Sequence, residues 1–178
     1  MLFDQSLPAA EDFPLSLKVT GADQTFALGQ AVAALLEGGE IILLYGPLGA
    51  GKTCFSQGLC DGLAVKEEVV SPTFTLVNTY SGGFFTVHHL DFYRVDPDHD
   101  LDDIGVPYIL EEVFSRQAVA LIEWPEPILP TIGLDEPRVE LFAMPGESVD
   151  DRIWYLRGVP EIPGPWANLF EQFPATTE

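Results

Sequence analysis

The eight residues GPLGAGKT, at positions 46–53, constrain the fold of this chain more than any other stretch. They fit the pattern G-x-x-x-x-G-K-[ST] of a phosphate-binding loop, which lies between a strand and a helix. The apolar run Ile41–Tyr45 predicts a strand buried on both faces, and the segment from Lys52 to about Leu63 predicts the helix. This context favours a phosphate loop over an ordinary glycine-rich turn.

The residue types in this loop predict how it holds a triphosphate. Glycines allow backbone N–H groups to converge on phosphate oxygens, and the positive end of the helix dipole points to the same place. The Lys52 ammonium can reach the β- and γ-phosphates, and the Thr53 hydroxyl can bind Mg²⁺. We therefore predict that the nucleotide is held by Gly46, Leu48, Gly49, Ala50, Gly51, Lys52 and Thr53.

Two acidic residues stand where apolar strands are predicted to end. Asp91 closes the segment FFTVHHLD, and Glu123 closes the segment AVALIE. Ligands of open α/β sheets bind outside the carboxyl ends of the strands. Either carboxylate can hold Mg²⁺ while the other orients the attacking water, so both are candidate catalytic residues beside Lys52. The sequence leaves open which of the two is the metal ligand.

The whole chain, residues 1–178, is expected to form one α/β domain around a mostly parallel sheet. Residues 1–13 and 160–178 are expected to be loosely packed tails, because the first segment carries proline and acidic residues and the second is rich in proline. Two strands joined by a short turn after the loop helix predict a β-hairpin. The expected elements outside the phosphate loop are strands at 15–19, 74–80, 84–90, 118–122, 139–143 and 153–156, and helices at about 23–36 and 107–114.

The charge balance excludes several classes of function. Eight basic residues stand against 28 acidic ones, a net charge of −20. Such a surface repels phosphate backbones, so we expect no strong direct nucleic-acid binding. No apolar run approaches the ~20 residues of a membrane span, and no signal peptide is visible. Cys54 and Cys60 make neither a disulfide framework nor a zinc pattern, so we expect a cytoplasmic protein.

Several other polar residues are expected to have structural roles. His88 and His89 lie inside a predicted strand without a third ligand at zinc spacing. Arg94 lies close to a run of aspartates, which favours an ion pair slightly over a phosphate contact. The acidic segment 96–103 lacks the glycine and glutamate of a calcium loop. Core positions, rather than a base-stacking surface, are expected for the aromatic residues Phe84, Phe85, Phe92 and Tyr93.

Four segments in this order carry a resemblance to a known family. They are LLYGPLGAGKTCFSQGL at 43–59, SPTFTLVNTY at 71–80, HLDFYR at 89–94 and IEWPE at 122–126. The first is generic among phosphate-loop proteins, whereas the other three together are far more specific. The chain resembles the TsaE (YjeE) family, the ATPases of bacterial tRNA threonylcarbamoyladenosine biosynthesis, from about residue 20 to residue 157.

The resemblance implies a fold, a reaction and partners. The fold is a P-loop NTPase-like three-layer sandwich with a hairpin inserted after the first nucleotide-binding helix. The reaction is slow, Mg²⁺-dependent ATP hydrolysis that supports the cycle of the partner proteins TsaB and TsaD. Lys52, Thr53, Asp91 and Glu123 match the functional residues of the family, with Glu123 as a magnesium ligand and Asp91 as the Walker-B-like or catalytic acid.

The resemblance also adds residues that the motifs alone do not mark. Trp124 matches a tryptophan beside the nucleotide. Ser71, Pro72, Thr73 and Thr75 match a switch-like segment that senses the γ-phosphate and contacts partners. Cys54 stands where the family usually has threonine or serine, but its backbone N–H can still bind phosphate. The segment after Pro160 has no counterpart, and the match near residues 22–25, where adenine contacts are expected, is weak.

Two other functions remain as alternatives. A small-molecule kinase can use the same loop, but it needs an acceptor pocket and usually an arginine-rich lid. The five arginines of this chain, at positions 94, 116, 138, 152 and 157, form no such cluster. A nucleotide-gated binding module with negligible turnover is the third possibility. The lack of an evident arginine finger predicts slow hydrolysis by the chain alone.

Overall fold

The computed structural model describes residues 7–81, 83–96 and 99–173. Its centre is a seven-stranded sheet in the order β1-β7-β6-β2-β5-β4-β3. The strands are β1 (Leu15–Thr20), β2 (Ile41–Tyr45), β3 (Val77–Tyr80), β4 (Thr86–Asp91), β5 (Ala118–Glu123), β6 (Arg138–Pro145) and β7 (Asp151–Val159). The helices are α1 (Gly21–Ala33), α2 (Lys52–Gly62), α3 (Val106–Phe114), α4 (Leu129–Ile132) and α5 (Gly164–Gln172), with short 3₁₀ turns η1 (Ala10–Asp12), η2 (Leu101–Ile104) and η3 (Glu126–Ile128).

The sheet is parallel in its centre and antiparallel at both edges. β2 pairs in parallel with β5 and β6, and β4 pairs in parallel with β5. The pairs β3–β4, β6–β7 and β1–β7 are antiparallel. The central strands β2 and β5 are buried along their whole length, as expected for apolar runs in a covered parallel sheet. The hairpin that follows the loop helix is therefore confirmed as β3–β4, at one edge.

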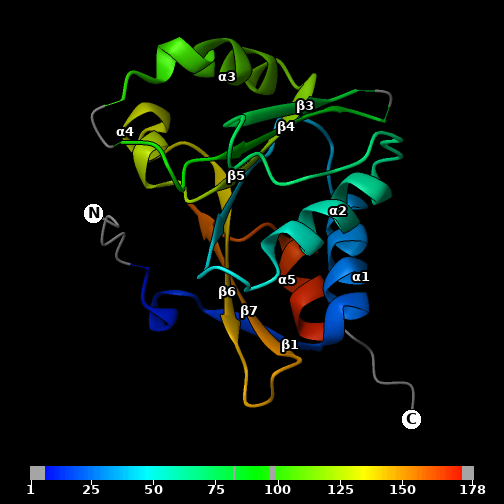
Figure 1. The fold of residues 1–178 in the computed structure, drawn as a ribbon. Helices are drawn as coiled ribbons and strands as arrows, with labels where there is room; N and C mark the ends of the chain where they lie inside the picture. Colours follow the sequence, from blue (N-terminus) through cyan, green and yellow to red (C-terminus); the bar gives the residue numbers. More distant parts are fainter. Residues whose placement is uncertain (1–6, 82, 97–98, 174–178) are drawn as a thin grey trace.

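Helices cover both faces of the sheet, which makes the predicted three layers (Figure 1). Side chains of α1, α2 and α5 pack in one hydrophobic cluster with one face of the strands. Side chains of α3, η3 and α4 pack in a second cluster with the other face. The two clusters fix the orientation of the sheet between the helices. The carboxyl ends of β2, β4 and β5 consequently meet at one edge, where β2 runs into the phosphate loop.

Helices α1 and α2 are in close contact because glycine takes the place of a side chain where they cross. A Cβ atom on Gly58 would lie 2.0 Å from the carbonyl oxygen of Phe26, and one on Gly29 would lie 2.3 Å from that of Phe55. Real Cβ atoms do not approach backbone so closely. The two glycines therefore allow α1 to lie directly against the helix that begins at the phosphate loop, and they hold that helix in place.

Two expectations about the chain need correction. The segment after Pro160 is not loose throughout, because α5 buries Trp166 and Phe170 against the cluster of α1 and α2. At the other end, Phe13 is buried beside Phe142, with ring centroids 5.7 Å apart. In both segments buried aromatic side chains fix the chain against the core. Residues 1–6 and 174–178 of the expected tails lie outside the described residues.

The strand expected at 74–80 is shorter than predicted. β3 begins at Val77, and Phe74 is exposed. Leu76 has a φ of +65°, a conformation that an extended strand does not allow. The backbone therefore turns at Leu76, and the residues before it leave the sheet and lie over the site described next. No helix in the described part of the chain is long and apolar enough to cross a membrane.

Candidate functional site

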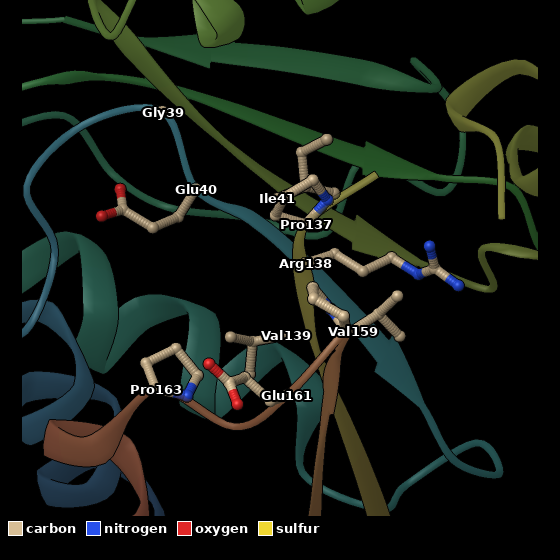
Figure 2. Close-up of a pocket in the computed structure, with 10 residues that line it drawn as sticks. Gly39, Glu40, Ile41, Pro137, Arg138, Val139, Val159, Glu161 and Pro163 are labelled. Atoms are coloured by element: carbon tan, nitrogen blue, oxygen red, sulfur yellow. The ribbon is translucent and has the colours of Figure 1, made fainter. Parts of the chain in front are cut away.

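Two cavities of similar size, of about 310 and 340 Å³, differ in chemistry. The larger lies at the opposite end of β2 and β6 from the phosphate loop, and Figure 2 shows its lining, which includes Pro137, Pro163 and the side chain of Arg138. That guanidinium donates to the carbonyls of Gly133, Leu134 and Glu136, and to the Glu140 carboxylate. The smaller cavity holds the phosphate loop and both predicted acids, so it is the candidate site.

The loop has the backbone geometry that its glycines predict. Gly51 is the N-cap of α2 with a φ of +99°, and Gly46 has a φ of +142°. A Cβ atom on Gly46 would lie 2.5 Å from the carbonyl oxygen of Ala143 on β6. A side chain at either position would force the loop out of this shape. The helix α2 begins at Lys52, so its N-terminal dipole end and free N–H groups face the cavity.

The Lys52 ammonium is folded back onto its own loop. Its Nζ atom donates to the carbonyl oxygens of Gly46 at 2.6 Å and Pro47 at 3.1 Å. It also lies 4.6 Å from the centroid of the Trp124 ring. Burial lowers the pKa of Lys52, and the nearby carboxylates of Glu123, Asp91 and Glu126 oppose that effect. The lysine side chain is thus buried at the loop, beside three acids.

Asp91 and Glu123 lie side by side, because β4 and β5 pair with these two residues in register. Both are nearly fully buried, with 2% and 3% of their surface exposed. The Asp91 Oδ1 atom accepts from the backbone N–H of Tyr93 at 2.9 Å. Its Oδ2 atom accepts from the hydroxyl of Thr73 at 2.8 Å and from that of Ser71 at 3.3 Å. The segment that precedes β3 is therefore tied directly to one acid of the site.

Glu123 has a different partner. Its Oε1 atom accepts a hydrogen bond from the Nε2 of His89, 2.9 Å away on the neighbouring strand β4. The preceding histidine, His88, pairs through its Nε2 with Glu112 of α3 at 2.7 Å. Among the described residues, His89 therefore contacts an acid of the site, whereas His88 contacts α3 on the other face of the sheet.

Trp124 follows Glu123 and adopts an unusual backbone conformation. Its φ is +52°, which is uncommon for a bulky residue and typical of functional sites. Its N–H donates to the carbonyl of Leu44, the penultimate residue of β2, at 3.2 Å. Its ring packs against that of Tyr93 with centroids 4.9 Å apart, and the Lys52 ammonium lies over it. This turn places the indole across the mouth of the phosphate loop.

Most of the predicted site residues line this one cavity. They are Leu48, Gly49, Ala50, Gly51, Lys52, Thr53, Cys54, Ser71, Thr73, Asp91, Glu123 and Trp124. Three others do not line it. Gly46 accepts the Lys52 hydrogen bond, and Pro72 is buried within the same segment. Thr75 is exposed, and its hydroxyl donates to the Asn78 side chain at 2.8 Å.

Sequence reasoning missed two residues of the site. Tyr93 lines the cavity and also packs against the core, whereas its neighbour Phe92 is fully buried. Its spacing of two residues from Asp91 was the available signal. Arg152 of β7 donates to the carbonyl of Gly49 at 3.3 Å, a contact that no local pattern could show. Arg94 lies over the ring of Phe74, 4.6 Å from its centroid.

The oxygen donors of the site fit a magnesium ion that completes its coordination with phosphate and water. Two carboxylates and the Thr53 hydroxyl line the cavity. Among residues 7–81, 83–96 and 99–173, no group of three or more His, Cys, Asp or Glu side chains could hold a metal ion by itself. Mg²⁺ typically takes one or two protein carboxylates together with phosphate oxygens. The site matches that pattern better than it matches a closed metal centre.

Fold and site together define the class of P-loop proteins, which bind nucleotides. Residues 19–149 match the family model described as "Threonylcarbamoyl adenosine biosynthesis protein TsaE". The chain belongs to the TsaE family.

Individual relatives of the chain are also TsaE proteins. The chain is 44% identical to the TsaE protein of Treponema pallidum over 105 residues, which are 59% of this chain and 74% of that protein. It is 36% identical to the Bacillus subtilis TsaE protein over 110 residues, 62% of this chain and 66% of that one. The crystal structure of Bacillus subtilis YdiB superposes with a TM-score of 0.67 at 25% identity, over 92% of this chain and 96% of that one.

Proposed function

We propose that this chain is an Mg²⁺-dependent ATPase that hydrolyses ATP slowly and supports the proteins that form N6-threonylcarbamoyladenosine on tRNA. The observation that carries the proposal is the meeting of Lys52, Asp91 and Glu123 in one cavity at the N-terminus of α2. A cation, helix N–H groups and two acids are the parts that phosphoryl transfer to water requires.

Each residue has a proposed role in this reaction. The loop N–H groups and Lys52 bind the phosphates, and the Trp124 ring borders them. Thr53 and one of the two acids hold the magnesium ion, which neutralises charge on the phosphate oxygens when it is bound. The other acid orients the attacking water. Glu123 is the better candidate for the metal ligand, because both Asp91 oxygens already accept hydrogen bonds from protein groups.

We expect slow ATP hydrolysis because the arginine beside the phosphate loop is bonded to backbone carbonyls. Arg152 is the arginine that contacts the loop in the described structure, and it donates to the carbonyls of Val149, Asp151 and Gly49. These bonds hold the guanidinium on the loop backbone. An arginine that contacts the transferred phosphate contributes about 10³–10⁵ in rate in related enzymes. We therefore propose that the partners, TsaB and TsaD in this family, raise the rate above that of the chain alone.

The test is calorimetric titration of the purified chain with Mg²⁺–ATP, followed by phosphate-release kinetics. Lys52→Ala should weaken nucleotide binding at least tenfold, because it removes the cation that meets the phosphates. Lys66→Ala is the control, since Lys66 is exposed and outside the cavity but carries the same charge. Equal affinity for the Lys52 variant and the unaltered chain would refute the proposal. Phosphate transfer to an added small molecule would favour the kinase alternative.

A further inference from the structure

His89 is buried within β4 and contacts one carboxylate of the candidate site. It is fully buried, and its Nε2 atom lies 2.9 Å from Glu123 Oε1. Glu123 is itself 3% exposed. A carboxylate removed from water in this way needs hydrogen-bond donors, and His89 is the protein donor that the described structure gives it. The contact thus satisfies one oxygen of a buried carboxyl group.

The strand register explains why this histidine meets this glutamate. Asp91 pairs with Glu123, and His89 pairs with Leu121, in the parallel ladder of β4 and β5. Side chains two residues apart on a strand point to the same face of a sheet. His89 therefore lies on the same face of the sheet as Asp91 and Glu123, two residues before the carboxyl end of β4. From there its imidazole reaches one oxygen of the neighbouring glutamate.

We infer that His89 is a positioning residue, which holds Glu123 Oε1 so that the carboxylate presents Oε2 toward a magnesium ion in the nucleotide site. This inference rests on the proposed function, because it takes Glu123 as a metal ligand. The other ring nitrogen, Nδ1, has no hydrogen-bond partner among the described residues. The Glu123 contact is therefore the polar interaction that accounts for a histidine at this buried position.

Donors behind a metal ligand fix its orientation, and their removal typically lowers metal affinity 10- to 100-fold. A purely structural histidine would affect stability instead. The magnesium dependence of nucleotide binding distinguishes a positioning role of His89 from a purely structural one. Loss of the His89 donor should weaken the Mg²⁺ affinity of the nucleotide complex about tenfold, and it should leave nucleotide affinity in EDTA within about twofold.

The chain offers both a conservative variant and a matched control. His89→Gln places an amide N–H near the former Nε2 and should keep Mg²⁺ affinity within about threefold, whereas His89→Leu removes the donor. His88→Leu removes the adjacent histidine, which contacts Glu112 on the opposite helix instead of the site, and should leave Mg²⁺ affinity unchanged. If His89→Leu does not fold, His89→Asn replaces it, because its shorter amide cannot reach Glu123.

Mg²⁺ titrations of the ATP complex, read by calorimetry, decide the question, with thermal unfolding as the check on folding. A loss in the Leu or Asn variant that Gln restores supports the inference. Unchanged Mg²⁺ affinity in a folded variant that lacks the donor, or an equal loss in the Gln variant, overturns it. Absence of any Mg²⁺-dependent binding by the unaltered chain would instead refute the proposed function.

Discussion

At the scale of single residues, the two acids of the site differ in the groups that donate hydrogen bonds to them. Asp91 accepts hydrogen bonds from Thr73 and Ser71, and Glu123 accepts one from His89. The two carboxylates lie next to each other and near Lys52, yet separate parts of the chain restrain them. The segment before β3 donates hydrogen bonds to Asp91, whereas a residue of β4 donates one to Glu123. A substitution at Ser71 or Thr73 therefore removes a hydrogen bond to Asp91 and leaves the hydrogen bond to Glu123 in place.

The Thr73 hydroxyl gives a first prediction. Thr73→Val keeps the shape of the side chain but removes the donor to Asp91 Oδ2. Hydrogen bonds to charged groups contribute about 1.5–3 kcal/mol, so the free energy of unfolding should fall by about 1–3 kcal/mol. Urea denaturation measures this. Thr75→Val is the matched control, because the exposed Thr75 hydroxyl bonds to Asn78 and not to an acid of the site in the described structure, and its loss should cost less than about 0.5 kcal/mol. Equal effects of the two variants would show that the Asp91 contact contributes nothing.

Asp151 gives a prediction about pH. Hydrogen bonds from Lys18, and then from Thr20, lower the pKa of this carboxyl to about 2. A carboxyl whose pKa falls on folding stabilises the native state above its unfolded pKa, near 3.8, and this contribution is lost as the pH falls through about 2. Asp151→Asn should therefore lower the melting temperature at pH 7, and the difference from the unaltered chain should shrink below about pH 4.

Melting curves between pH 7 and pH 2 test this expectation. Asp135→Asn removes the charge of an exposed aspartate and serves as the control. A difference between the Asp151 variant and the unaltered chain that stays constant over the whole range would contradict the assignment to the ionised carboxylate.

At the scale of elements, the position of the loop helix depends on its contact with α1. Gly58 and Gly29 let the two helices touch backbone to backbone, and Phe55 and Leu59 of α2 bury their side chains in the core cluster that α1 also joins. Because α2 begins at Lys52, a shift of this helix also moves the phosphate loop. The packing of α1 thus contributes to the geometry of the site although it lies outside the motif.

Gly58→Ala tests this coupling. The added Cβ would lie 2.0 Å from the Phe26 carbonyl oxygen, so the helices must separate. We expect a loss of about 1–3 kcal/mol in the free energy of unfolding, as for overpacking of a tight interface, together with weaker ATP binding. Gly164→Ala is the control, since a Cβ there meets nothing within 4 Å. A Gly58 variant as stable as the control would show that the two helices do not need this close contact.

At the scale of the whole molecule, the net charge of −20 opposes binding of this chain to the phosphate backbone of a nucleic acid. Binding to a phosphate backbone gains most of its free energy from lysine and arginine, and this chain has eight such residues. Lys52, Arg138, Arg152 and Arg157 already contact groups of the protein itself. The charge therefore predicts weak direct binding of this chain to tRNA.

The chain alone should bind tRNA with a dissociation constant weaker than about 10⁻⁴ M at physiological salt, the weak end of non-specific binding. Fluorescence anisotropy of labelled tRNA measures this directly. Tighter binding that weakens steeply with added salt would reveal a basic surface that the net charge hides.

Much of the fold could be predicted from local sequence. The strand β2, the loop, the helix α2 and the hairpin β3–β4 follow from apolar runs and glycine positions within a few residues of one another. The helix α5 and the burial of Phe13 could not be predicted, because their partners lie on α1 and β6, far away in the chain. The predicted start of β3 was wrong by three residues, because the backbone turns at Leu76 and the preceding residues bond to Asp91 instead of continuing the strand.

The sequence by itself determined the chemistry of the site: a glycine loop, a lysine, a threonine and two acids at strand ends, because each is recognised from its immediate neighbours. Only the tertiary structure decided which atoms meet. The pairing of β4 with β5 brings Asp91 beside Glu123 and His89 to Glu123, and the positive φ of Trp124 carries its ring over Lys52. These contacts join residues more than thirty positions apart, so they exist only once the sheet has formed.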